Sequence, residues 1–131
     1  MDLPRDEIAF RKEYECLVLE RAITTVFRPG NRIYPNWRGY RPGEVVTARI
    51  IEKCGCDRRE IPPVFNNIKT PVQIAEIDVF AINALKPAHF RGSSPDVADI
   101  GSLKDHLFYI YGKPVEAFGG EVTRIGLRYL D

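Results

Sequence analysis

With 131 residues, of which 44% are hydrophobic and 28% charged, the chain has the size and composition of one globular domain with a modest core. Its formal net charge of +1 excludes a strong overall attraction to nucleic acid or to membranes, so electrostatic binding has to come from local clusters of charge. No apolar run approaches the roughly 20 residues that span a bilayer, and acidic residues stand where a signal peptide has its basic start, so we expect a cytoplasmic protein without membrane contact.

The first elements expected along the chain are a helix and a short strand. Residues 8–22 predict the helix, because apolar and amphipathic side chains recur there at spacings of four and three from Phe10 to Arg21. We expect Cys16 to be a buried thiol on this helix. The run "ITTVFR" comes next and predicts a strand, since it is rich in β-branched residues and a Pro-Gly pair ends it.

Two further strands are expected in the middle of the chain. The first covers residues 44–52, where every second side chain is apolar and points to one face: Val46, Ala48 and Ile50. Residues 53–67 predict a polar loop that contains proline. The second strand covers residues 72–82, and its apolar face begins at Ala75 and continues through Ile77.

The last part of the chain predicts a helix and a strand. Residues 102–112 carry an apolar helical stripe made by Leu103, Leu107 and Ile110. Ser102 and Asp105 form a pair that resembles a capping box at the start of this helix, and Gly112 ends it. The run "EVTRIGLRYL" alternates and predicts the closing strand.

Strands therefore outnumber helices, and most of them show one buried face. This pattern favours an α+β fold, built as a small mixed or antiparallel β-barrel with flanking helices, in a single domain over residues 1–131. Contiguous βαβ units are missing, so we do not expect a doubly wound parallel sheet.

Three motifs in this order resemble the ASCH domain of the PUA-like superfamily. They are "TTVFR" at residues 24–28, "YRPGEVVTARI" at residues 40–50, and a helix, "IYG" and strand unit from Leu103 to Leu130. The resemblance covers nearly the whole chain. It implies a PUA-like β-barrel with a cleft between the barrel and its helices, and a partner that is RNA or a nucleotide-like ligand.

Arginines and aromatic residues gather in the stretch "RPGNRIYPNWRGYRPGE", residues 28–44, although the chain as a whole is nearly neutral. The candidate binding residues there are Arg28, Arg32, Tyr34, Trp37, Arg38, Tyr40 and Arg41. Arginine pairs with phosphate through two donors, and aromatic rings stack on unpaired bases, as in single-stranded RNA recognition. Alternatively, the aromatic side chains pack the loop onto the barrel, and the arginines pair with acids such as Asp57 or Glu60.

Arg28 is the strongest single candidate, because alternation along the strand lets Phe27 enter the core while Arg28 faces the cleft. The segment "RGSSPDV" offers a second anion site. There Arg91, Ser93 and Ser94 would hold a phosphate at the start of a helix that Ser94 caps. Alternatively, this segment is a turn that only begins a helix. Only the family resemblance suggests that it lies near Arg28.

The resemblance also implies a hydrolase as an alternative function. One branch of the family removes the acetyl group from acetylated cytidine with a Lys and a Thr in a "KTxTxR"-like segment and a Glu on the later strand, and other members are ribonucleases. Here Ile23 stands in place of the Lys and Val26 in place of the second Thr, while the strand Glu falls near Gln73, or on Glu76 after a register shift. The candidate catalytic residues that remain are Thr24, Thr25 and Glu76.

Two carboxylates on the long strand have three possible roles. Glu76 and Asp78 share a face about 7 Å apart, given the rise of a strand. They form an acid–base pair, a solvated face, or salt bridges with Arg124 and Arg128 on another strand.

No metal site and no cofactor are expected. Cys54 and Cys56 in "KCGCD" supply too few ligands for a structural zinc site, and neither His89 nor His106 belongs to a second ligand pair. We interpret His106 as a partly buried structural residue. The third alternative for the function is a protein-interaction domain whose aromatic loop contacts a protein partner of unknown identity.

Overall fold

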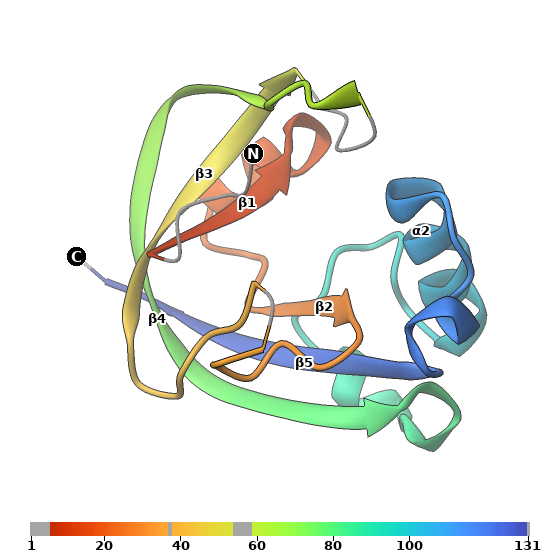
Figure 1. Ribbon diagram of the computed structural model, residues 1–131. Coiled ribbons are helices and arrows are strands. Elements are labelled where there is room, and N and C mark those ends of the chain that lie inside the picture. The colour runs from red at the N-terminus through yellow and green to blue at the C-terminus, as the bar shows by residue number, and fades with distance from the viewer. Residues whose placement is uncertain (1–5, 37, 54–58, 131) are drawn as a thin grey trace.

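The protein folds as a mixed α+β structure around one curled sheet. The computed structural model describes residues 6–36, 38–53 and 59–130. Its sheet has the strand order β1-β3-β4-β5-β2. The strands are β1 (Glu7–Arg11), β2 (Thr25–Pro29), β3 (Val45–Lys53), β4 (Val64–Ala81) and β5 (Glu121–Tyr129). β1 runs parallel to β3 and the other pairs are antiparallel, and the sheet curls into a half-barrel (Figure 1). This architecture confirms the expected mixed, barrel-like sheet.

The helices are few and short, and the longest one begins earlier than expected. They are α1 (Glu15–Leu19) and α2 (Ile100–Tyr111), with 3-10 turns η1 (Lys12–Tyr14), η3 (Ile82–Ala84), η4 (Pro87–Phe90) and η5 (Val115–Phe118). The predicted pairing of Ser102 with Asp105 at the start of α2 is wrong. Instead, Asp99 accepts a hydrogen bond from the Ser102 amide at 2.8 Å, and Ser102 Oγ accepts one from the Asp99 amide. Gly112 ends the helix in the left-handed conformation, as predicted.

The structure differs most from the sequence prediction in the N-terminal segment. Residues 7–11 form strand β1 where a helix over residues 8–22 was expected, and only Glu15–Leu19 is α-helical. Ile8 and Phe10 are both buried, at the two-residue spacing of a strand, and β1 pairs with β3. The spacing of four from Phe10 to Tyr14 imitates a helical stripe, because short apolar runs do not distinguish the two structures. Cys16 is exposed, so the expected buried thiol is also wrong.

The predicted strands in the rest of the chain are confirmed, with two changes in β4. This strand begins at Val64, so residues 64–67 belong to the sheet and not to the expected loop. The pairing with β5 shifts register between Ile74 and Glu76, which leaves Ala75 exposed at a bulge and not on the face of Ile77.

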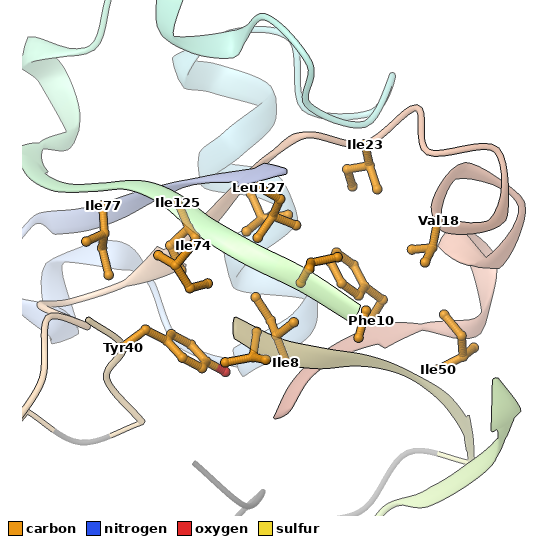
Figure 2. Packing of buried hydrophobic residues seen from close by; sticks show 14 residues of the cluster. Ile8, Phe10, Val18, Ile23, Tyr40, Ile50, Ile74, Ile77, Ile125 and Leu127 are labelled. Carbon is orange, nitrogen blue, oxygen red and sulfur yellow. The ribbon is translucent and has the colours of Figure 1, made fainter. Parts of the chain in front are cut away.

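Two hydrophobic clusters lie on opposite sides of β2. The first fills the inside of the curl and includes Val26, Ile74 and Ile125 (Figure 2). The second includes Phe27 from β2 together with Leu103 and Leu107 from α2. Because neighbouring side chains of a strand point to opposite faces, β2 contributes to both clusters. In the part of the chain that the structure describes, no helix is both long and apolar enough to cross a membrane.

We expect the first cluster to dominate stability. Ile74 is fully buried in it, whereas Ile61 is 49% exposed. Ile74→Ala is expected to lower the free energy of unfolding by about 2–5 kcal/mol, because it leaves a cavity in packed surroundings. Ile61→Ala removes the same atoms from the surface and is expected to cost less than about 1 kcal/mol. Urea unfolding of the two variants measures the difference, and equal losses would contradict this assignment of the core.

Candidate functional site

The side chain of Arg28 connects the two edges of the curled sheet. β1 and β2 stand at opposite ends of the strand order, yet Arg28 Nη2 on β2 donates a hydrogen bond to the carbonyl oxygen of Ala9 on β1 at 2.9 Å. Nη1 donates to the carbonyl oxygen of Phe27 at 3.1 Å, and the guanidinium carbon lies 5.8 Å from the ring centroid of Phe10. Phe27 is buried in the second cluster, as predicted. We define the seam as Ala9, Phe10, Arg28 and Arg32.

Arg32 brings a second positive charge to the seam. It is only 4% exposed, and its Nε donates to the carbonyl oxygen of Pro29 at 3.1 Å. Its guanidinium carbon lies 5.9 Å from the ring centroid of Tyr111 on α2. Burial lowers the pKa of Arg32; Tyr111 opposes this effect, and the nearby charge of Arg28 adds to it. An arginine stays protonated despite such shifts, so two cations share this partly dehydrated region.

Tyr40 fastens the loop between β2 and β3 to the barrel. Its side chain is buried, and its hydroxyl donates to the carbonyl oxygen of Glu7 on β1 at 2.6 Å. Its backbone amide donates to the carbonyl of Arg32. Of the two roles open to Tyr40, packing is therefore the one that its side chain performs. At the neighbouring Gly39 a Cβ would lie 2.7 Å from the carbonyl oxygen of Asn36, so only glycine fits this turn.

The outer part of the same loop presents an arginine and an aromatic ring to solvent. Arg41 is exposed, and its guanidinium carbon lies 4.1 Å from the ring centroid of Tyr34, which is 39% exposed. Arg38 is half-buried and adopts a positive φ of 53°. Trp37 and Asp57, which also entered the loop hypothesis, lie outside the described residues. The loop thus has an anchored inner side and an accessible outer side.

Side chains from three segments meet where α2 approaches η1. The hydroxyl of Tyr14 donates to Asp96 Oδ2 at 2.6 Å and lies 3.2 Å from Nδ1 of His106. Ser94 Oγ donates to the other carboxylate oxygen of Asp96. Burial lowers the pKa of His106, Asp96 opposes this, and the charge of Arg28 lowers it further. We call Tyr14, Ser94, Asp96 and His106 the Tyr14 cluster.

Residues 91–94 form a turn and do not cap a helix. The carbonyl oxygen of Gly92 accepts hydrogen bonds from the amides of Thr24 and Thr25, and Ser93 Oγ lies within hydrogen-bonding distance of the carbonyl oxygens of Phe90 and Val97. α2 begins only at Ile100, so the predicted helix start at Ser94 is wrong. Arg91 is exposed. The segment is therefore a turn, as one of the two interpretations expected, but it does not begin a helix.

The candidate catalytic residues Thr25 and Glu76 meet at Arg124. Arg124 Nη1 lies 3.1 Å from Glu76 Oε2, and Nη2 donates to Thr25 Oγ1 at 3.3 Å. Thr25 Oγ1 in turn donates to the carbonyl oxygen of Arg91 at 2.7 Å. The salt-bridge role considered for Glu76 is thus observed. The cluster lies on the face of β2 opposite to Arg28, because odd and even positions of a strand point apart.

The third candidate from that group, Thr24, packs closely against the turn at Gly92. A Cβ added at Gly92, which has a φ of +83°, would lie 2.2 Å from Thr24 Oγ1. The two segments therefore approach each other more closely than any side chain at position 92 allows. This contact, like that of Thr25, holds the turn against β2.

A surface hollow of about 400 Å³ lies at the end of β1, beside η1 and β3. It is lined by Arg11, Lys12, Glu13, Ile51 and Glu52. Its charges neutralise one another, since Lys12 pairs with Glu52 at 2.6 Å and Arg11 with Glu13 at 3.0 Å. A hollow with paired charges of both signs offers no selective attraction for an anion.

Metal ligands do not gather in the described part of the chain. Over residues 6–36, 38–53 and 59–130, no group of three or more His, Cys, Asp and Glu side chains is placed to hold a metal ion. Cys54 and Cys56 lie outside those residues. His89 packs its ring 4.6 Å from that of Phe80 and accepts a hydrogen bond from the Lys86 amide.

Sequence reasoning missed Tyr14, Asp96 and Tyr111. Tyr14 was assigned to a helical stripe, and Asp96 sits in a segment considered only for its serines and arginine. Tyr111 carries no local signal beyond its place at the end of a helix. Tyr111 meets Arg32, and Tyr14 and Asp96 meet His106, only through tertiary contacts, which spacing along the chain does not reveal.

Comparisons with known proteins found no relative of this chain. No family model matches it, and neither does any curated protein or solved structure.

We predict that the hydrogen bond from Arg28 to β1 stabilises the fold. Arg28→Ala removes the donors that bridge the two sheet edges and is expected to lower the free energy of unfolding by about 1–3 kcal/mol. Arg28→Gln keeps an N–H donor without the charge and is expected to lose less. Urea unfolding at neutral pH compares the two variants. A stability of Arg28→Ala equal to that of the wild type would show that the seam is closed by other contacts.

Proposed function

We propose that this chain is a PUA-like module of the ASCH type that binds RNA or a nucleotide-like ligand through the seam and the loop of residues 30–44. The single observation that carries the proposal is the environment of Arg28. This side chain is half-buried, its hydrogen bonds go to two neutral carbonyl oxygens, and no described carboxylate lies within salt-bridge distance of it. Its positive charge is therefore left to attract an anion.

Other arginines of the protein support this interpretation by contrast. Arg49 pairs with Glu7 at 2.8 Å and Arg124 pairs with Glu76 at 3.1 Å, so each has a carboxylate partner. Arg28 instead lies close enough to Arg32 to lower its pKa. Two like charges held together cost free energy, and a bound phosphate would offset that cost with charge-assisted hydrogen bonds.

The exposed outer side of the loop is better suited to binding a nucleobase than to binding a phosphate group alone. Tyr34 presents a ring that Arg41 already covers at 4.1 Å, and an arginine plane and an aromatic ring are both surfaces on which unpaired bases stack. Single-stranded nucleic acid offers bases and phosphates together. It is therefore the ligand class that fits both the seam and the loop.

We do not propose catalysis. Ile23 stands where the amidohydrolase branch has its lysine, and it is buried in the first cluster, so it supplies no charge. Thr25 and Glu76 are held by Arg124 in a contact that joins β2, β4 and β5. No observed arrangement of these residues favours a nucleophile and its base.

We predict that binding of a fluorescein-labelled oligouridine depends on Arg28. Arg28→Gln is expected to weaken binding and to reduce the slope of log affinity against log salt concentration by about 0.7, the value for one lost phosphate contact to a single strand. Fluorescence anisotropy over about 50–200 mM salt measures both effects.

Arg128→Gln is the matched control, because it makes the same change at an exposed position on β5. It is expected to leave the affinity and the slope unchanged. Equal effects of the two variants would mean that only net charge matters, and no salt-dependent binding by the wild type would overturn the proposed function. Salt-insensitive binding of a protein would instead favour the interaction-domain alternative.

We predict a separate contribution from stacking on the loop. Tyr34→Ala is expected to lower the affinity for the oligouridine by about 1–3 kcal/mol, the usual value of one base–aromatic stack. The same variant is expected to bind inorganic polyphosphate as the wild type does, because this polymer has no bases. An equal loss for both ligands would show that Tyr34 acts by shaping the loop and not by stacking.

A further inference from the structure

The Tyr14 cluster joins the barrel to α2 and has no part in the proposed binding function. Tyr14 belongs to η1, while Asp96 and His106 lie before and within α2. Besides the hydrogen bonds already described, the rings of Tyr14 and His106 meet edge to face, with centroids 5.9 Å apart and an interplanar angle of 68°. Close by, the guanidinium carbon of Arg11 lies 5.1 Å from the ring centroid of Tyr109. Of the groups in these contacts, His106 is the one that titrates near neutral pH, so the contacts of His106 depend on its protonation.

The hydrogen-bond geometry assigns the protons within the cluster. Tyr14 has one hydroxyl proton, and the short contact of 2.6 Å to the Asp96 carboxylate uses it. The oxygen of Tyr14 then accepts a hydrogen bond from Nδ1–H of a neutral His106 at 3.2 Å. Protonation of His106 adds a proton at Nε2 and places a positive charge on a side chain that is only 15% exposed.

Charged groups from several elements surround His106. Asp96, 3.8 Å away, and Glu13 in η1 favour the imidazolium. Arg28 on β2 and Arg11 at the end of β1 disfavour it. Burial is the largest effect and also disfavours it, so the pKa of His106 lies below its ordinary value of 6.5.

The carboxylate of Asp96 remains ionised over the range in which a histidine titrates. Burial opposes its ionisation, but hydrogen bonds from Ser94 and Tyr14, together with the nearby His106, lower its pKa overall. Of the groups in the cluster, His106 is therefore the one that changes charge between about pH 5 and pH 8.

We propose that Tyr14, Asp96 and His106 form a proton-sensitive latch, which holds α2 against η1 at neutral pH and releases it as His106 takes up a proton. The direction follows from linkage. In the closed state His106 binds a proton less readily than a solvated histidine, so proton uptake favours the open state. The latch is fully effective above pH 6.5 and weakens as the pH falls below that value.

Opening of the latch would change the seam as well. Tyr111 belongs to the same helix as His106, and its ring packs 5.9 Å from the guanidinium of Arg32. Release of α2 therefore changes the surroundings of Arg32. An effect on ligand affinity rests on the proposed function, whereas the latch itself does not, and the experiment below measures α2 without any ligand.

Native-state hydrogen exchange followed by NMR tests the latch between about pH 7.5 and pH 5.5, the range in which histidine titrates. After correction for the intrinsic pH dependence of exchange, protection of α2 amides is expected to fall by up to about tenfold per pH unit, the limit for uptake of one proton. Amides of β3 and β4 are expected to keep their protection. A parallel fall in the strands would mean global unfolding and would overturn the proposal.

Three variants separate the latch from other titrating groups. His106→Gln still offers an N–H donor and does not titrate, so protection of α2 is expected to become independent of pH. His89→Gln removes the other histidine and is expected to behave as the wild type. Tyr14→Phe breaks both hydrogen bonds and is expected to show low α2 protection already at pH 7.5. Retention of the wild-type pH dependence in His106→Gln, or of wild-type protection in Tyr14→Phe, would overturn the latch.

Discussion

The hydrogen bond from Arg28 to the carbonyl oxygen of Ala9 determines how the curled sheet ends. A complete barrel would close its edges by pairing the backbones of two strands, which removes unpaired polar groups. Here β1 and β2 are each five residues long, and the reach of one side chain joins them. The cost is a half-buried positive charge that has no carboxylate partner among the described residues. Under the proposed function, the group that closes the sheet is also the group that binds an anion, so stability and ligand binding would depend on one residue.

The distribution of charge in the molecule says more about its local electrostatics than the net charge does. The formal net charge of +1 is nearly neutral, yet carboxylates neutralise arginines such as Arg49 and Arg124 and leave Arg28 with carbonyl partners. Burial reduces screening by solvent. Positive charges at the seam therefore produce a stronger potential than the same number of charges on the surface would. Burial is the main reason that the pKa of His106 on α2 is lowered, and the charge of Arg28 lowers it further.

Local patterns in the sequence predicted most strands, α2 and the burial of Phe27, because each depends on alternation or on a helical stripe within one segment. They failed for β1, where the spacing from Phe10 to Tyr14 imitates a helix and the parallel pairing with β3 has no local signature. The bulge at Ala75 was missed for the same reason, since a register shift is a property of two strands. For the candidate site, spacing identified the arginines but not the partners of His106, which come from distant segments.

The length of β4 has a consequence for how the protein folds. Its 18 residues pair with β3 through the first part and with β5 through the second, so a single strand supports both halves of the sheet. The strands β3 and β4 follow each other in the chain, whereas β2 pairs with β5, the last strand, across most of the sequence. Closing that long loop costs chain entropy before its contacts form, which slows folding. This topology favours early pairing of β4 with its neighbours and later pairing of β2 with β5, on which the contact of Arg28 with β1 depends.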